Sequence, residues 1–192
     1  MKKKYISAQD LLDDSWLLAL NIIDSGFQPD LIIGVWRGGT PVGIAIQEAL
    51  AFAGINCDHM AIRTESYTGI GTRTDVKVHG LDYIARALKP AQALLLVDDV
   101  YDTGLSLAEV CRQLAAIYGD ELPAIRMATP YFKPANNKTS RAPDYCLHTT
   151  DQWLVFPHEL LGLSDQEIAS EKPGIDTVRR RLLALRNTVN KR

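Results

Sequence analysis

The sequence has few cysteines and no long apolar run, and both shortages narrow the classes of protein to which it can belong. Three cysteines occur in 192 residues, at Cys57, Cys111 and Cys146. Their wide spacing fits neither a disulfide framework nor a zinc site, so we expect buried or half-buried thiols in a cytoplasmic protein. The apolar runs are too short to span a membrane, and no apolar signal core follows the basic N-terminus.

An excess of charge of one sign is also missing. The formal net charge is −2, with 21 basic and 23 acidic residues, which gives no indication of a surface that coats nucleic acid. The sequence contains no internal repeat and no low-complexity tract. Hydrophobic residues make up 46% and charged residues 23%, as in ordinary globular proteins. The length suits one α/β domain with its own core.

The most informative stretch runs from Ala93 to Leu107, where an apolar segment precedes two adjacent carboxylates, Asp98 and Asp99. Residues 93–97 have the pattern of a buried parallel strand. After a short loop, apolar residues recur with the spacing of one helix face; they are Leu107, Val110, Cys111, Leu114 and Tyr118. The stretch therefore predicts a strand, a loop and a helix.

The loop and the start of this helix predict an anion site. The first N–H groups of a helix have no intrahelical partner, and the helix dipole places partial positive charge there. Gly104 allows a ligand to approach the backbone, and the hydroxyls of Thr103 and Ser106 can donate to phosphate oxygens. Asp98 and Asp99 suit sugar hydroxyls or a hydrated Mg²⁺. Together these groups predict a phosphorylated sugar as the ligand.

A second loop of the same kind follows the apolar segment 31–35. Arg37 precedes two glycines, and Thr40 followed by Pro41 predicts the N-cap and first residue of a helix. A cation and glycines at a helix start suit a second anion.

Four other segments complete the expected domain. Ser7 and Asp10 predict a capped helix over residues 7–25. Residues 65–74, rich in Gly and Thr, predict a mobile loop, and its flanking strands predict a two-stranded flap. We expect a short helix over residues 81–88. Further strands are expected over residues 124–129 and 145–148.

The C-terminal segment differs in character from the rest of the chain. Ser164 and Glu167 form a capping box at the start of residues 164–192. A basic helix follows, with an apolar stripe made of Val178, Leu182, Leu185 and Val189. We expect this extension to dock on the domain or on a partner subunit rather than on a membrane or nucleic acid.

Residues 98–106 resemble the phosphoribosyl diphosphate (PRPP) motif of type I phosphoribosyltransferases, and the resemblance covers most of residues 31–159. It implies an α/β fold in which a central, mostly parallel twisted sheet is flanked by helices, with a small hood and a flexible lid loop. It also implies that residues 1–163 form the phosphoribosyltransferase domain, including the hood, and that residues 164–192 form a helical extension.

The same resemblance assigns roles to the two loops. Asp98 and Asp99 would hold the ribose and Mg²⁺, and Arg37 and Gly38 would bind pyrophosphate. A cis peptide bond would join Trp36 to Arg37. The 5-phosphate would be bound by Asp102, Thr103, Gly104, Leu105 and Ser106.

Other landmarks resemble the members that act on 6-oxopurines. Lys133 would donate to the purine 6-oxygen, an acceptor that suits an ammonium group, and Trp153 would stack on the ring beside the backbone of Leu154. Ser66 and Tyr67 resemble the start of a lid that excludes water. Glu159 matches an Asp that binds a second Mg²⁺ in the bacterial xanthine-guanine enzymes.

The function implied is transfer of 5-phosphoribose from PRPP to N9 of hypoxanthine, guanine or xanthine in purine salvage. Asp102 would be the general base at purine N7. The products would be a nucleoside monophosphate and pyrophosphate. We expect a cytoplasmic homodimer or homotetramer, with no membrane or nucleic-acid partner.

Two alternatives stay open. One is a regulator that keeps this fold as a PRPP sensor and binds nucleic acid through basic residues of the tail. The other is a phosphoribosyltransferase for a different base. The sequence also departs from the family, because Ser106 stands where threonine is usual. No arginine lies between Arg141 and Arg179, where some relatives place one for pyrophosphate.

Overall fold

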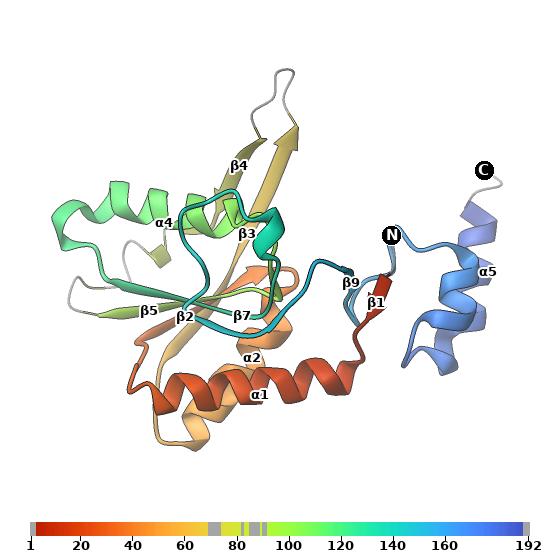
Figure 1. Cartoon of the computed structure of the whole chain (residues 1–192), viewed down its shortest axis with the longest axis horizontal. Coiled ribbons are helices and arrows are strands. Elements are labelled where there is room, and N and C mark those ends of the chain that lie inside the picture. Colours follow the sequence, from red (N-terminus) through yellow and green to blue (C-terminus); the bar gives the residue numbers. More distant parts are fainter. Residues whose placement is uncertain (1–2, 69–73, 82, 85–88, 90–91, 190–192) are drawn as a thin grey trace. The chain divides into compact units, whose positions relative to one another are not determined.

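The computed structural model describes residues 3–68, 74–81, 83–84, 89 and 92–189 (Figure 1). Its contacts form two compact units: a large unit, Leu12–Asp151, and a small unit, made of Met1–Leu11 and Gln152–Arg192. The domain boundary expected at residue 163 stays a prediction. Within the described ranges, no helix combines the length and the apolar character that crossing a membrane requires.

The large unit is built on a mostly parallel sheet with the strand order β4-β3-β2-β5-β7-β6, and β8 lies beside β7 (Figure 1). The strands are β2 (Leu31–Trp36), β3 (Asp58–Thr68), β4 (Thr74–His79), β5 (Ala93–Val97), β6 (Val100–Tyr101), β7 (Ala124–Phe132) and β8 (Tyr145–Thr149). β3 and β4 are antiparallel, whereas the other neighbours are parallel. These pairings confirm both the predicted fold class and the two-stranded flap.

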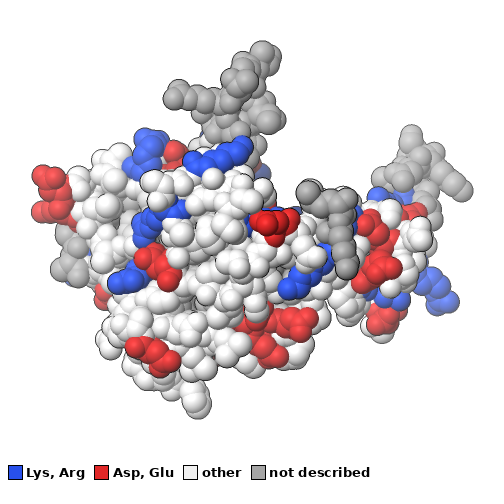
Figure 2. Space-filling view, viewed as in Figure 1, with Lys and Arg blue, Asp and Glu red and all other residues white. Residues whose placement is uncertain are grey.

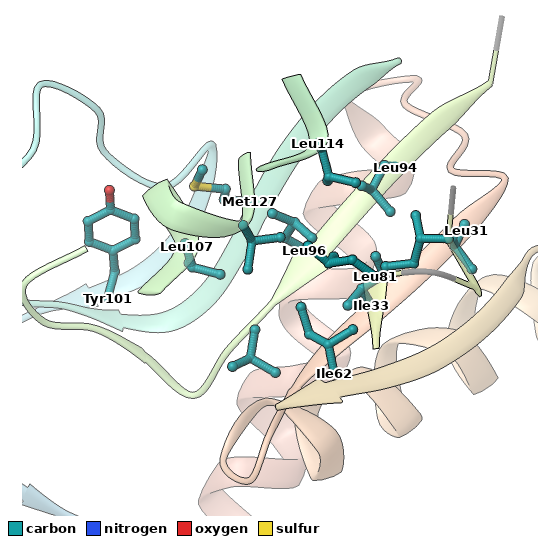
Figure 3. Packing of buried hydrophobic residues seen from close by; sticks show 13 residues of the cluster. Leu31, Ile33, Ile62, Leu81, Leu94, Leu96, Tyr101, Leu107, Leu114 and Met127 are labelled. Carbon is teal, nitrogen blue, oxygen red and sulfur yellow. The ribbon is translucent and has the colours of Figure 1, made fainter. Parts of the chain in front are cut away.

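Helices cover this sheet, and the apolar residues predicted for the central helix form its buried side. The helices are α1 (Ala8–Asp24), α2 (Gly39–Phe52) and α4 (Leu105–Tyr118). Leu107 and Leu114 of α4 belong to one core cluster with Leu94 and Leu96 of β5 (Figure 3). Burying one such side chain stabilises a fold by about 1.5–3 kcal/mol. This packing fixes α4 directly after the carboxylates that end β5.

Two local predictions are wrong in detail. Thr40 is not the N-cap of α2, because the helix begins at Gly39 and the Thr40 hydroxyl donates to the carbonyl of Arg37 at 2.7 Å. The loop expected from residue 65 begins later, because β3 pairs with β4 as far as Thr68. Ser66 and Tyr67 therefore lie in a strand; their side chains and residues 69–73 are outside the described part. Most of the expected 81–88 helix is outside it as well.

The small unit joins the two ends of the sequence. β1 (Lys3–Tyr5) pairs in parallel with β9 (Trp153–Val155), and a π-helical turn (Glu167–Glu171) and α5 (Asp176–Val189) follow. Its core consists of Val155, Leu163 and Ile168, with Tyr5, Ile175 and Leu183 packed around them. The predicted stripe on α5 is not this inward face, since Val178 and Leu185 are 49% and 56% exposed.

Glu167 holds three parts of the small unit together. Its carboxylate accepts hydrogen bonds from the Tyr5 hydroxyl at 3.2 Å and the Ser164 amide at 2.8 Å, and it pairs with Lys3 at 2.5 Å. The reciprocal bond from the Glu167 amide to the Ser164 hydroxyl, at 3.2 Å, confirms the predicted capping box. The Lys3 ammonium and the Ser164 bonds lower the pKa of Glu167 to about 2.

This shift predicts a pH-dependent contribution to stability. Because the folded pKa is below the usual value of 4.5, the contribution is complete above pH 4.5 and is lost as the pH falls toward 2. Glu167→Gln should therefore lower the melting temperature at pH 7, and its difference from the wild type should shrink at pH 4 and again at pH 3. Circular dichroism melting measures this, with Glu171→Gln on the same turn as control. A difference independent of pH would contradict the prediction.

Candidate active site

The end of β5 places two adjacent carboxylates in a largely buried position. Asp98 is half-buried and Asp99 is 8% exposed, and the Asp99 amide donates to Asp98 Oδ1 at 3.0 Å. Burial, followed by the neighbouring charge of Asp99, raises the pKa of Asp98 well above its ordinary value. Carboxylates with a strongly raised pKa are common at binding and catalytic sites, so the pair is a candidate binding element.

The loop after these carboxylates encloses a small polar cavity at the N-terminus of α4. The cavity has a volume of about 80 Å³ and is lined by residues that include Asp98, Asp102, Thr103, Gly104 and Ser106. Since a single water occupies roughly 30 Å³ of liquid, the space admits a group larger than one water. The first amides of α4 and the two hydroxyls make it suitable for a phosphate group.

Gly104 is required at this position for two reasons. Its φ of 75° lies in the left-handed region, and a Cβ atom there would meet the ring of Tyr101, with the hydroxyl oxygen 2.5 Å away. Tyr101 is itself buried, and its hydroxyl contacts Thr139 Oγ1 at 2.9 Å and donates to the Arg141 carbonyl at 3.1 Å. Tyr101, which has no predicted role, therefore packs directly against the backbone of this loop.

The loop between β2 and α2 lies directly against the carboxylate pair. The peptide bond between Trp36 and Arg37 is cis, as the family resemblance implied. A Cβ atom at Gly38 would overlap the Asp99 carboxylate. The predicted pyrophosphate loop and the predicted ribose-binding acids are therefore in close contact with each other. Arg37 itself is exposed beside them.

The structure also brings together the predicted general base and the predicted purine-binding lysine. Lys133 Nζ donates to Asp102 Oδ2 at 3.0 Å, and the Lys133 side chain is 10% exposed whereas that of Asp102 is 40% exposed. On the other side, Asn136 Nδ2 donates to Asp102 Oδ1 at 2.7 Å. No role for Asn136 is predicted from the sequence. Asp102 is thus oriented by two donors while its carboxylate remains open to a ligand.

The remaining predicted residues belong to the small unit. Trp153 is 55% exposed and has an accessible ring, whereas Leu154 is buried in β9. Glu159 accepts a hydrogen bond from the Phe156 amide at 3.0 Å, so one carboxylate oxygen is already engaged. Their proposed contacts with a purine or a second Mg²⁺ stay predictions.

A second cavity and the carboxylate-rich residues elsewhere in the chain differ from this site. A larger cavity of about 500 Å³ lies beside α2, β2 and β3, but its lining includes none of Asp98, Asp99 and Asp102. Its walls are mainly apolar, with a few polar side chains that include Thr40, Gln47 and His59. Among the described residues, no group of three or more His, Cys, Asp or Glu side chains has the arrangement of a metal site. A cation at Asp98 and Asp99 would therefore need further oxygens from a substrate or from water.

Charge on the surface is mixed on the face that Figure 2 shows. Over the large unit, Lys and Arg side chains alternate with Asp and Glu, without a continuous basic patch.

Comparison with known proteins is consistent with this geometry. Residues 5–161 match the family model described as "Phosphoribosyl transferase domain". A purine phosphoribosyltransferase from Pyrococcus horikoshii is 29% identical, with a TM-score of 0.65 over 85% of this chain and 99% of that chain. A search of curated proteins gives no match.

Two further solved structures are similar in fold. A hypothetical protein from Neisseria gonorrhoeae with bound ppGpp has a TM-score of 0.64 at 20% identity, over 84% of this chain and 91% of that chain. A xanthine-guanine-hypoxanthine phosphoribosyltransferase from Helicobacter pylori has a TM-score of 0.60 at 19% identity, over 81% and 92%.

Proposed function

Because the chain belongs to the phosphoribosyltransferase family, we propose that it transfers 5-phosphoribose from PRPP to N9 of a 6-oxopurine. The observation that carries the choice of base is the 3.0 Å contact between Lys133 and Asp102 beside the polar cavity. It places an ammonium donor and a carboxylate acceptor together, as the adjacent 6-oxygen and N7–H of such a purine require. The similarity to a purine phosphoribosyltransferase from Pyrococcus horikoshii supports a purine as the base.

In the proposed reaction, the bond between ribose C1′ and the pyrophosphate oxygen breaks, and a bond from purine N9 to C1′ forms. The N7 proton of the base passes to the Asp102 carboxylate, and pyrophosphate leaves with the bonding electron pair. The cavity lined by Thr103, Gly104 and Ser106 would hold the 5-phosphate, and Arg37 and Gly38 would supply donors to the leaving pyrophosphate. Asp102 acts as the general base in this step, a role that requires its carboxylate to lie within hydrogen-bond distance of N7.

Asp98 and Asp99 fit a single hydrated Mg²⁺ shared with the substrate. Two adjacent carboxylates with further oxygens from PRPP and water are an ordinary magnesium environment, and both lie close to the predicted pyrophosphate loop at Gly38 and Gly39. When bound, Mg²⁺ would neutralise charge on pyrophosphate. The two acids would also accept hydrogen bonds from the ribose hydroxyls.

The test is an absorbance assay with PRPP and Mg²⁺ in which hypoxanthine, guanine, xanthine, adenine, uracil and orotate are compared. Turnover of 6-oxopurines alone is expected, since an ammonium donor suits a carbonyl and not the amino group of adenine. Turnover of uracil or orotate instead would replace the proposed substrate class. No turnover with tight PRPP binding would favour a PRPP-sensing regulator.

A further inference from the structure

The segment from Lys133 to Arg141, here called the collar, is bonded along the loop that carries Asp102. The Lys133 amide donates to the Tyr101 carbonyl at 2.9 Å, and the Lys138 amide donates to the Thr103 carbonyl at 3.0 Å. These two bonds lie on either side of Asp102 in the sequence. The position of the Asp102 backbone is therefore fixed by the collar as well as by α4.

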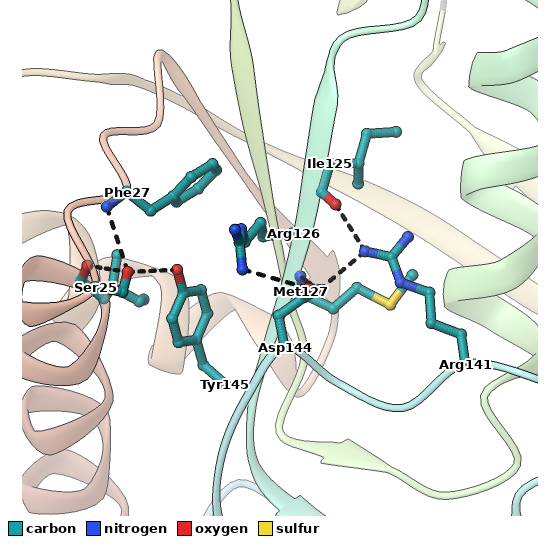
Figure 4. Close-up of polar contacts among 9 residues, drawn as sticks. Ser25, Phe27, Ile125, Arg126, Met127, Arg141, Asp144 and Tyr145 are labelled. Atoms are coloured by element: carbon teal, nitrogen blue, oxygen red, sulfur yellow. Dashed lines mark hydrogen bonds and ion pairs between the residues drawn. The ribbon is translucent and has the colours of Figure 1, made fainter.

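The far end of the collar is anchored to the sheet. Arg141 donates to the Ile125 carbonyl at 2.7 Å and to Asp144 Oδ2 at 2.9 Å, and the same carboxylate oxygen accepts from the Met127 amide at 2.8 Å (Figure 4). Figure 4 shows Arg141 and Asp144 reaching β7 from the same connecting segment. The collar thus has a rigid support at β7.

Two consecutive asparagines in the collar, Asn136 and Asn137, form hydrogen bonds with different parts of the structure. Asn137 bonds within the collar, because its Nδ2 donates to the Arg141 carbonyl at 2.9 Å and its Oδ1 accepts from the Thr139 amide at 2.9 Å. Asn136 instead donates across to Asp102 Oδ1 at 2.7 Å. Since a carboxylate only accepts, the amide nitrogen of Asn136 is the atom that faces it.

We propose that Asn136 is a positioning residue that holds the Asp102 carboxylate in its catalytic orientation; this inference rests on the proposed function. Lys133 holds the other oxygen of Asp102, but in the reaction its ammonium must also donate to the purine. Asn136 carries no charge, so its hydrogen bond orients the carboxylate without neutralising it. The base remains held by one oxygen while Lys133 engages the substrate.

The experiment compares Asn136→Ala with Asn137→Ala in single-turnover assays of a 6-oxopurine and PRPP. Asn136→Ala should lower the rate of the chemical step about tenfold, the loss expected for one hydrogen bond to a charged group. Its KM for PRPP and its melting temperature should stay close to those of the wild type. Asn137→Ala should lower the melting temperature and leave the rate of the folded protein nearly unchanged.

Asn136→Asp provides a second, isosteric variant that removes the donor and places a like charge beside Asp102. It should lower the rate further than Asn136→Ala does. A wild-type rate in Asn136→Ala would overturn the inference while leaving the proposed function intact, and so would equal losses of rate and stability in both alanine variants. Absence of turnover in the wild type would overturn the proposed function and this inference with it.

Discussion

Asp102→Asn is expected to lower the rate of phosphoribosyl transfer by about 10²–10⁴-fold, the range for loss of a general base. Affinity for PRPP should change little, because the amides and hydroxyls of the cavity remain. The substitution keeps the size of the side chain but removes the group that takes the N7 proton. Single-turnover rates with hypoxanthine or guanine, and calorimetric titration with PRPP and Mg²⁺, measure the two effects separately.

The structure also predicts the orientation of the side-chain amide that Asp102→Asn introduces. This amide has one accepting oxygen, whereas the Asp102 carboxylate accepts hydrogen bonds from both Lys133 and Asn136. We expect the oxygen to face Lys133, because an ammonium that is mostly buried loses more without an acceptor than an exposed amide does. Asp120→Asn, an exposed substitution beyond the end of α4, is the matched control. A normal rate in Asp102→Asn would remove Asp102 from the base role.

Local signals in the sequence predicted the central part of the fold well. The apolar segment Ala93–Val97 is β5, and the helical spacing that begins at Leu107 matches the buried side of α4. The capping box at Ser7 is present, with the Asp10 amide donating to the Ser7 hydroxyl at 3.0 Å. Such features depend on neighbours in sequence, so a single sequence contains them.

Features that depend on pairing between distant segments were not predictable. β1 and β9 are three-residue strands that are far apart in the sequence, and each is too short for an apolar periodicity. The contact of Asn136 with Asp102 depends on the register of β6 with β7, in which Tyr101 lies opposite Phe132. Nothing in the polar loop itself distinguishes Asn136 from Asn137.

The packed face of α5 could not be identified from the sequence for a different physical reason. Arg179 and Arg186 donate to the carbonyls of Lys172 and Leu163, at 3.0 Å and 2.7 Å. Long cationic side chains can satisfy inward carbonyls while their stems lie on apolar surface. An apolar stripe on its own therefore does not identify the packed face of such a helix.

The close approach of the two loops predicts a second large effect, at glycines near the start of α2. A methyl group at Gly39 would lie 2.9 Å from the Cα atom of Asp98 and would overlap the Val97 carbonyl. Both belong to backbone that cannot rotate away. At Gly38, by contrast, the obstacle is the Asp99 side chain, and the φ of −66° suits any residue.

Gly39→Ala should therefore destabilise the protein by about 3 kcal/mol, at the upper end for overpacking. This corresponds to a fall in melting temperature of roughly 6–12 °C. Gly43→Ala in the same helix is the control: its methyl group would meet ordinary contacts at 3.7 Å, and the better helix propensity should add roughly 0.5–1 kcal/mol. Equal melting temperatures for the Gly39 and Gly43 variants would show that the two loops are not in close contact.

Gly38→Ala should fold but lose PRPP affinity, because the Asp99 side chain must move away from its position beside this loop. Unchanged PRPP affinity in this variant would separate Asp99 from substrate binding.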